Sequence, residues 1–302
     1  MNRIVITHAD LDGVGCAFLL ARCFPVDNLK FVTRHSELHD LIIALKDVPP
    51  SEVWITDLSI HKKTAKLLAN THHDINYVDH HNTSVYLKDM YDWAFVDTGC
   101  SATLSLWRIL SSKFELQDFE GLITTIDDYD CYGYEANEPS IPAQHLNALQ
   151  LILGPFLMLK RLHNKPSPKI TDNEAQFIAA SIYKDEQYIQ NVHDPIEATS
   201  SAGKFLLVCC ERCTSKIGNL LLHDNPDVEF IVLPNYNTRT IGLRGRGDFN
   251  LSLLAKYFNG GGHPKAAGFE LPTIHLHSPN QIKELIANAC TAIVHKKAAK
   301  NG

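Results

Sequence analysis

The residues that end the first apolar segment restrict the fold of this chain more than any other feature of the sequence. In the stretch RIVITHADLDGVGCAFLL, at residues 3–20, an apolar run stops at His8 and is followed by Asp10 and Asp12. Side chains alternate between the two sides of an extended backbone, so these three residues converge if the chain stays extended there. The pattern therefore predicts a buried strand that ends in several metal-binding groups.

Two later apolar runs end in the same kind of residue. The run VWITD ends at Asp57, and the run INYVDHH ends at Asp79, His80 and His81. Each piece has an ordinary explanation by itself, because DLDG is a common turn and an isolated aspartate after a strand is often a helix N-cap. Three such ends on three predicted strands rarely coincide by accident, and together they favour a metal site.

Strand-like and helix-like segments alternate through the first half of the chain. We expect strands at residues 4–7, 29–33, 53–56, 75–78 and 94–96, with helices that include residues 16–23 and 62–70. Gly13 and Gly15 are expected to allow a tight turn from the first strand into a helix. This alternation predicts an α/β fold with a parallel, doubly wound sheet. Since such sheets bind ligands at the carboxyl ends of their strands, the polar residues should meet in one cleft.

A second α/β unit follows a helical region. Helices are expected at residues 117–126, 148–162 and 174–192, the second of them interrupted at Gly154 and Pro155. Beyond them we expect strands at residues 205–208, 229–233 and 239–243, and helices at residues 215–222 and 251–258. The sequence thus predicts a catalytic domain with its helical connector at residues 1–192, a linker at residues 193–204, and a smaller domain at residues 205–302.

Charge and composition exclude several classes of protein. The formal net charge is −6, with only a short basic tail, HKKAAKNG, whereas proteins that wrap long duplexes usually present a basic face. No apolar run reaches the roughly 18 residues of a membrane span, so we expect a soluble, cytoplasmic protein without a membrane partner. The eight cysteines are too dilute for a disulfide scaffold, and Cys209, Cys210 and Cys213 lack the partner pair of a structural zinc site.

Closely packed carboxylates repel one another unless a cation lies among them. A mixture of aspartate oxygens and histidine nitrogens suits Mn²⁺ better than Ca²⁺, with Mg²⁺ as an alternative. Two ions roughly 3.5–4 Å apart would account for so many acids, because such pairs clamp the attacking and leaving oxygens in phosphoryl transfer. We therefore expect two divalent ions that share one carboxylate.

The motifs resemble those of a known family. The DHH triplet at residues 79–81, the earlier HADLDG and the later GGGHPKAAGF occur in the order typical of the DHH phosphoesterase superfamily with a C-terminal DHHA1 domain. The resemblance covers nearly the whole chain. It is greatest to the nanoRNase-like branch, whose members are oligoribonucleases or cyclic-nucleotide phosphodiesterases.

The resemblance implies roles for individual residues of the first domain. It implies these metal ligands: His8, Asp10, Asp12, His80 and a bridging Asp57. It also implies that His81 acts beside the scissile phosphate, so His81 and Asp57 are the expected catalytic residues. Asp79 is expected to support a metal-bound histidine through a hydrogen bond, as carboxylates commonly do.

The fourth metal motif of the family is a single aspartate after a helical stretch. The segment TTIDDYDCYGY offers Asp127, Asp128 and Asp130, and the resemblance does not choose among them. An aromatic residue four positions later is a common companion, and Tyr132 stands at that distance from Asp128. We therefore favour Asp128 as the ligand, with the other two as capping or supporting residues.

Several segments are candidates for binding the substrate's phosphates. Glycine-rich backbone and arginine side chains both suit phosphate oxygens. The resemblance assigns Arg244 and His263 to the substrate, with Gly261 and Gly262 beside them, and leaves Arg246 and Lys265 open. Ser101, at the start of an expected helix, is a further candidate, although ordinary capping would also explain it.

The sequence therefore predicts a divalent-metal-dependent phosphodiesterase that hydrolyses short oligonucleotides or dinucleotides with a metal-activated water. The alternatives are a cyclic-dinucleotide phosphodiesterase, a small-phosphate hydrolase such as a pyrophosphatase, and, less favoured, a non-catalytic nucleotide-binding module. Substrate length, cleavage polarity and the choice of RNA or DNA stay open. The oligomeric state also stays open, with a homodimer as one option.

Overall fold

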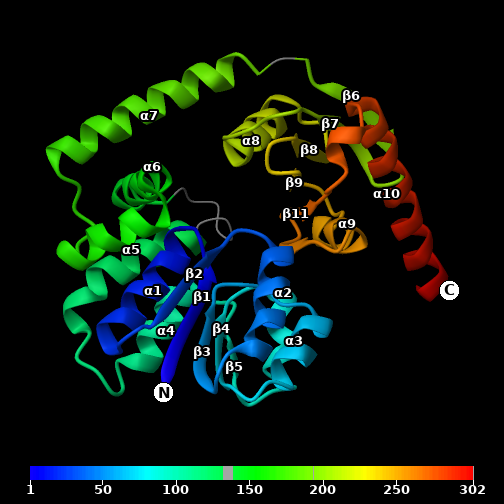
Figure 1. Ribbon diagram of the computed structural model, residues 1–302. Helices are drawn as coiled ribbons and strands as arrows, with labels where there is room; N and C mark the ends of the chain where they lie inside the picture. Colours follow the sequence, from blue (N-terminus) through cyan, green and yellow to red (C-terminus); the bar gives the residue numbers. More distant parts are fainter. Residues whose placement is uncertain (132–138, 193, 302) are drawn as a thin grey trace. The chain divides into compact units, whose positions relative to one another are not determined.

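The computed structural model describes residues 1–131, 139–192 and 194–301. The chain divides into two compact units, Met1–Ile182 and Tyr183–Gly302, and the boundary falls inside a helix. The first unit contains a parallel five-stranded sheet and the second contains another sheet, so the predicted α/β class is confirmed (Figure 1).

The sheet of the first unit is parallel throughout, with the strand order β2-β1-β3-β4-β5. Its strands are β1 (Asn2–His8), β2 (Asn28–Val32), β3 (Ser51–Thr56), β4 (Asp74–Asp79) and β5 (Ala94–Val96). β1, β3 and β4 are the strands whose ends carry the candidate ligands, and β3 pairs with both of the others. The pairing therefore brings the three predicted polar strand ends to neighbouring positions.

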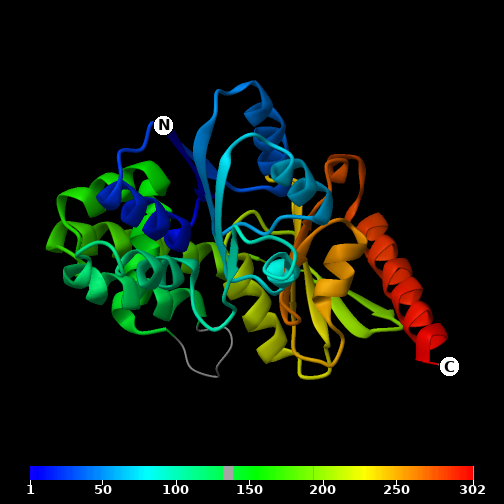
Figure 2. The same ribbon diagram turned by 90° about the horizontal axis from the view of Figure 1, so that it is seen from below.

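Helices cover both faces of this sheet (Figures 1 and 2). The helices of the first unit are α1 (Leu11–Cys23), α2 (His35–Ala44), α3 (Lys62–Ala69), α4 (Ala102–Leu110), α5 (Glu120–Cys131) and α6 (Ile141–Asn164), with short 3₁₀ turns η1 (Leu45–Asp47), η2 (Asn82–Leu87) and η3 (Gln117–Phe119). α1, α4, α5 and α6 pack into one apolar core with Val5, Trp54 and Val78. α2 and α3 share the opposite core, so the sheet is doubly wound as predicted.

α6 and α7 (Asp172–Gln190) form the predicted helical region. Gly154 has a φ of 71° and interrupts α6 just before Pro155, which confirms the expected break. Among the described residues, no helix is both long enough and apolar enough to span a membrane.

Gly13 and Gly15 have a different purpose from the one predicted. Both lie inside α1, which begins at Leu11, and neither has a positive φ, so they do not form a turn. A Cβ atom on Gly13 would overlap the backbone of His8, and one on Gly15 would overlap Thr103. The glycines therefore allow α1 to lie close against the end of β1 and against α4.

The second unit contains a six-stranded mixed sheet with the order β10-β11-β9-β8-β7-β6. Its strands are β6 (Ile196–Ser200), β7 (Gly203–Leu207), β8 (Phe230–Asn235), β9 (Thr240–Gly245), β10 (Gly261–Gly262) and β11 (Ala266–Glu270). Its helices are α8 (Thr214–Asp224), α9 (Leu251–Tyr257) and α10 (Pro279–Asn301), with a 3₁₀ turn η5 (Ile274–Leu276). Only β7 and β8 pair in parallel.

Two segments of this unit differ from their expected structure. Residues 193–204 were expected to form a linker, but they include β6, which pairs antiparallel with β7 and packs against α10. The basic C-terminal segment was expected to be a frayed tail, but it continues α10 as far as Asn301. β6 alternates half-buried and exposed residues, which is the pattern of an edge strand that buries little apolar surface.

Candidate metal centre

The loop between β1 and α1 places the first two aspartates. Asp10 is the N-cap of α1, and its Oδ1 accepts a hydrogen bond from the amide of Gly13 at 2.9 Å. Asp12, in the first turn, is almost fully buried, and its carboxylate accepts the amides of Ala102 at 2.9 Å and Thr103 at 2.8 Å. Because those amides begin α4, the positive end of this helix stabilises and orients the Asp12 carboxylate.

The same helix terminus shows the contacts of Ser101, which was predicted as a candidate phosphate ligand or as an ordinary cap. The Ser101 hydroxyl accepts the amide of Leu104 at 3.2 Å and therefore caps α4. The Ser101 amide donates to Asp127 Oδ1 at 2.7 Å, and the next two amides donate to Asp12. Carboxylates of the protein already use the donors that a phosphate would need.

Asp57 follows β3 and is 2% exposed. Its backbone has a φ of 55°, which is unusual for a residue other than glycine. One of its oxygens, Oδ2, lies 3.6 Å from His8 Nδ1, and the other, Oδ1, lies 3.3 Å from His80 Nε2. The two oxygens thus face two different histidines, which is the geometry of a carboxylate that can bridge two ions.

The strand ends converge as the sequence predicted. Three overlapping sets of ligand atoms form, and within each set the atoms lie within 4.8 Å of one another: His8, Asp10 and Asp57; Asp12, His80 and Asp130; and Asp57, His80 and His81. Asp57 and His80 each belong to two of these sets. The cluster therefore brings together all the predicted metal ligands except Asp128.

Asp130 lies in the cluster, whereas Asp128, which the sequence favoured as the ligand, does not belong to any of the three sets. Asp130 Oδ2 lies 3.3 Å from His80 Nε2. Asp130 follows the fully buried Ile126 by four residues and Ile123 by seven, so all three lie on the inner face of α5. Asp128 lies on a different face of the helix, because successive residues are rotated by about 100°.

The other two acids of this segment have local partners. Asp128 Oδ2 accepts the amide of Ser140 at 3.0 Å, which ties α5 to the start of α6. Asp127 accepts the amide of Ser101 and so joins α5 to α4. Tyr132, on which the preference for Asp128 rested, lies outside the described residues.

The residues of this cluster fit divalent cations. Asp57 Oδ2 and Asp130 Oδ2 are buried and have no hydrogen-bond partner within residues 1–131, 139–192 and 194–301. Buried carboxylate oxygens are costly unless a donor or a cation compensates them. The mixed set of carboxylate and imidazole ligands is of the kind that binds Mn²⁺ and similar ions.

Burial and mutual repulsion shift the pKa values within the cluster. Burial raises the pKa of Asp12 to about 7, with a further contribution from Asp57, and burial also raises the pKa of Asp130. Burial alone would lower the pKa of His80, but Asp57, Asp130 and Asp12 outweigh it and raise this pKa to about 11. His8 and His80 outweigh the effect of burial on Asp57 and hold its pKa well below the usual range. In the protein without bound ions, protons on these groups therefore offset the negative charge of the carboxylates.

Asp79 supports a different histidine from the one expected. Its Oδ1 lies 2.7 Å from His81 Nδ1, and the carboxylate is fully buried. An ionised carboxylate only accepts hydrogen bonds, so Nδ1 of His81 carries the hydrogen and donates it. The ring of His81 is therefore held through Nδ1 by the Asp79 carboxylate.

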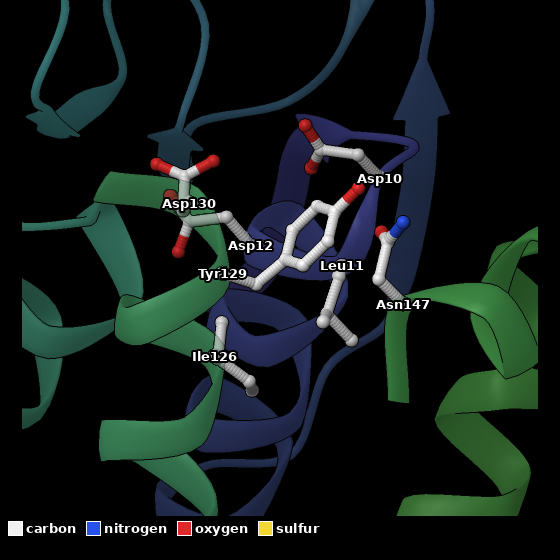
Figure 3. A pocket seen from close by; sticks show the side chains of 7 residues that line it. All are labelled: Asp10, Leu11, Asp12, Ile126, Tyr129, Asp130 and Asn147. Atoms are coloured by element: carbon white, nitrogen blue, oxygen red, sulfur yellow. The ribbon is translucent and has the colours of Figure 1, made fainter. Parts of the chain in front are cut away.

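A small pocket adjoins the acidic cluster (Figure 3). Its lining residues are Asp10, Leu11, Asp12, Ile126, Tyr129, Asp130 and Asn147. The ring of Tyr129 stands between the carboxylates and Asn147, with its hydroxyl directed toward Asp10. The sequence reasoning missed Tyr129 and Asn147. Tyr129 stands next to Asp130 in the sequence, whereas Asn147 is an ordinary polar residue of a helix and carries no sequence signal.

In the second unit, the predicted phosphate-binding residues Arg244 and His263 lie near one end of the sheet. Arg244 is in β9, and its Nη2 donates to Ser215 Oγ of α8 at 2.5 Å. The His263 amide donates to the carbonyl of Ala266 at 2.7 Å, and Ala266 is paired with Arg244 across β11 and β9. The strand register thus brings the two predicted residues close together.

The glycines and the remaining cations of this region have structural contacts. Gly261 and Gly262 form β10, and a Cβ atom on Gly262 would overlap the backbone of β11. Lys265 Nζ donates to the carbonyls of Arg246 and Gly247, which fixes the turn after β9. The Arg246 side chain is exposed. Lys265 is therefore explained by the fold.

The chain has relatives among characterised proteins, although no family model matches it. The oligoribonuclease NrnB of Bacillus subtilis is 26% identical over 288 residues, which cover 87% of this chain and 71% of the relative. The 3′,5′-cyclic-nucleotide phosphodiesterase of Helicobacter pylori is 21% identical over 347 residues, covering 94% and 98% of the two chains.

A solved structure shares the fold. RecJ from Thermus thermophilus in complex with Mn²⁺ aligns with 95% of this chain and 52% of its own length, at a TM-score of 0.57 and 12% identity. The same protein in complex with Mg²⁺ gives a TM-score of 0.53 at 13% identity, with coverages of 95% and 49%.

The fold and the cluster define an α/β protein whose residues at the carboxyl ends of parallel strands fit divalent cations. The comparisons agree with the motifs HADLDG, DHH and GGGHPKAAGF. They confirm the predicted resemblance to the DHH phosphoesterase superfamily, with this chain as a distant relative of curated phosphodiesterases.

Proposed function

We propose that this protein is a divalent-metal-dependent phosphodiesterase that hydrolyses short oligonucleotides. The observation that carries the proposal is the Asp57 carboxylate, whose two buried oxygens face His8 on one side and His80 on the other. Such a bridging carboxylate is needed by two-ion phosphoryl-transfer sites. The oligoribonuclease relative supports a short nucleic acid as substrate.

The two ions of this proposal are Mn²⁺ in the first instance, with Mg²⁺ as an alternative. His8, Asp10 and Asp57 would hold one ion, and Asp12, Asp57, His80 and Asp130 would hold the other. When bound, the ions lower the pKa of a coordinated water and neutralise charge that develops on the phosphate. Asp130 replaces Asp128 in this ligand set.

His81 is the proposed catalytic residue of the protein itself. Its Nδ1 is held by Asp79 at 2.7 Å, and Nε2 is the nitrogen proposed to contact the substrate. Asp79 raises the pKa of His81, against the effect of burial. His81 can therefore carry a proton on Nε2 and give it to the leaving oxygen, or stabilise charge on the phosphate.

The second unit is the proposed substrate-binding part, corresponding to a DHHA1 domain at residues 205–302. Arg244 offers a forked guanidinium to phosphate oxygens, and His263 lies beside it in the strand register. Gly261 and Gly262 keep the backbone next to His263 free of side chains, so a phosphate can approach it closely. A few cations at one place favour a short substrate over a long duplex.

The direct test is hydrolysis of a dinucleotide, longer oligoribonucleotides and a long duplex in Mn²⁺. We expect the short substrates to be cleaved and the duplex to be spared. His81→Ala should lower kcat by about 10²-fold while calorimetry shows unchanged Mn²⁺ affinity. His39→Ala is the matched control, because His39 contacts Thr64 outside the cluster. Absence of turnover in the wild-type protein with every nucleotide would refute the proposal.

Cyclic nucleotides are the second candidate substrate. The relative from Helicobacter pylori, which aligns over 94% of this chain, carries the name 3′,5′-cyclic-nucleotide phosphodiesterase. The same cluster could hydrolyse a cyclic phosphodiester, because the ions act on the phosphate and not on the nucleoside. Comparing kcat/KM for a linear dinucleotide, a cyclic mononucleotide and a cyclic dinucleotide separates the two candidates.

A further inference from the structure

We infer that Tyr77 is a positioning residue that holds both the bridging carboxylate Asp57 and the catalytic His81 in place. The inference rests on the proposed function, because it assigns a purpose to a buried hydroxyl behind the candidate metal centre. Neither the motifs nor the family resemblance draws attention to Tyr77.

The hydroxyl of Tyr77 makes three short contacts. Tyr77 lies in β4, two residues before Asp79, and is 1% exposed. Its Oη lies 2.7 Å from the Leu58 carbonyl, 2.7 Å from Asp79 Oδ2 and 2.8 Å from Ser84 Oγ. The phenol has a single hydrogen, which the Leu58 carbonyl and Asp79 Oδ2 share as acceptors, while the Ser84 hydroxyl can donate to Oη. Together the three contacts join the segments after β3 and after β4.

The contact with Leu58 fixes the backbone that carries Asp57. Asp57 has a φ of 55°, a conformation that persists only where the surroundings hold it. The Asp57 amide donates to the Val78 carbonyl at 2.9 Å, and the carbonyl of the following residue, Leu58, contacts the Tyr77 hydroxyl. These two contacts hold the peptide group before Asp57 and the peptide group after Leu58, so the segment that carries Asp57 is held on both sides. The direction of the Asp57 carboxylate therefore depends on Tyr77.

The contact with Asp79 fixes His81. Asp79 Oδ2 contacts Tyr77, and Asp79 Oδ1 contacts His81 Nδ1 at 2.7 Å. The carboxylate is held from behind by a hydroxyl on β4, an interior strand of the sheet, and this contact opposes rotation away from the imidazole. Tyr77 thus acts on His81 through Asp79 and on the ions through Asp57.

The test removes the hydroxyl and retains the ring. Tyr77→Phe keeps the apolar packing, including the ring contact with Trp93. Tyr86→Phe is a matched control in the same unit, because Tyr86 Oη also donates to a backbone carbonyl, that of Ile60, at 2.8 Å and has no contact with the cluster. Asp79→Asn separates the two effects, because it removes the negative charge beside His81 while the Leu58 carbonyl keeps the Tyr77 hydroxyl as its partner.

Four quantities are measured for each variant: Mn²⁺ affinity by calorimetry, kcat and KM on a dinucleotide at saturating Mn²⁺, and the midpoint of thermal unfolding. Tyr77→Phe should weaken Mn²⁺ binding by about 10-fold and lower kcat by about 10-fold, with KM unchanged. Asp79→Asn should lower kcat and leave Mn²⁺ affinity at the wild-type value. Tyr86→Phe should leave the Mn²⁺ affinity and kcat within about twofold of the wild-type values, even if it lowers the unfolding midpoint as much as Tyr77→Phe does.

Wild-type Mn²⁺ affinity in Tyr77→Phe would overturn the inference about Asp57. An unchanged kcat at saturating Mn²⁺ would overturn the inference about His81. Equal losses in Tyr86→Phe would show that both hydroxyls act only through stability. If the wild-type protein cleaves no nucleotide, the proposed function fails, and the Mn²⁺ affinities still decide whether Tyr77 positions Asp57.

Discussion

Asp130 Oδ2 lies 3.3 Å from Nε2 of His80, and no other hydrogen-bond donor reaches it in the described part of the chain. Asp128, two residues earlier on the same helix, instead accepts the amide of Ser140. We therefore predict that Asp130→Asn weakens Mn²⁺ binding by at least about 10-fold, because it removes a charged ligand. Calorimetric titration of the purified variant with Mn²⁺ measures this loss.

Asp128→Asn is the control for that prediction. It makes the same chemical change on the same helix, and the amide oxygen can still accept the hydrogen bond from Ser140. Mn²⁺ affinity should stay within about twofold of the wild-type value. A larger loss in Asp128→Asn than in Asp130→Asn would mean that the ligand was assigned to the wrong aspartate.

Mn²⁺ binding should release protons and become tighter as the pH rises. The raised pKa of His80, about 11, means that its imidazole is protonated at neutral pH in the metal-free protein. A metal ligand must be deprotonated, so the ion has to displace this proton. Each proton displaced should strengthen binding by about 10-fold per pH unit as the pH rises.

Calorimetry in two buffers with different heats of ionisation checks this prediction. The observed heat should differ between the buffers by the number of protons released multiplied by the difference in ionisation heat. Equal heats in both buffers, together with an affinity that does not change between pH 6 and pH 8, would contradict it.

The strand ends could be predicted because their pattern is local. Apolar runs followed by His8, Asp57 and His80 identify both the strands and the edge where they meet, since parallel strands share one carboxyl edge. Asp130 could also have been found from the sequence. It follows Ile126 and Ile123 at the spacing of one helix face, and that periodicity is a better guide than the distance to an aromatic residue.

Other features depend on tertiary contacts and have no sequence signal. The positive φ of Asp57 occurs in a segment whose Asp57 amide is held by Val78 and whose Leu58 carbonyl is held by Tyr77. At the start of α4, the amides of Ser101 and Ala102 donate to Asp127 and Asp12. These two carboxylates are distant in sequence, so no local pattern predicts them at this helix terminus. A helix N-terminus binds whichever anion the fold brings to it, and here that anion is a carboxylate of the protein.

The segment between α6 and α7 should depend on the ion pair of Arg161 and Glu174 for stability. Arg161 Nε donates to Glu174 Oε1 at 3.0 Å and its guanidinium also bonds backbone carbonyls of the loop. Glu174 and Thr171 bond each other's amides, which makes a capping box at the start of α7. We predict that Glu174→Gln lowers the free energy of unfolding at pH 7 by about 1 kcal/mol.

The pH dependence of this difference has a definite sign. Burial would raise the pKa of Glu174, but Arg161 and Thr171 outweigh it and lower the pKa from 4.5 to about 2. The contribution of the carboxylate is therefore complete above pH 4.5 and is lost as the pH falls through about 2. Urea unfolding of wild-type protein and Glu174→Gln between pH 7 and pH 2 measures it. A difference that grows toward low pH would contradict the assignment.

Gly13 should tolerate no side chain, because α1 lies against the end of β1 at this point. A Cβ atom would overlap the backbone of His8, which cannot move aside as a flexible side chain can. We predict that Gly13→Ala destabilises the protein by about 1–3 kcal/mol and displaces His8, so that Mn²⁺ affinity falls as well.

Gly121→Ala is the matched control, since Gly121 lies in the first turn of α5 with open space where its Cβ would be. Alanine there should leave Mn²⁺ affinity unchanged and stabilise the helix by up to about 1 kcal/mol. Urea unfolding measures the change in stability of both variants, and calorimetry measures their Mn²⁺ affinity. Equal effects at the two positions would show that Mn²⁺ binding does not depend on the close approach of α1 to His8.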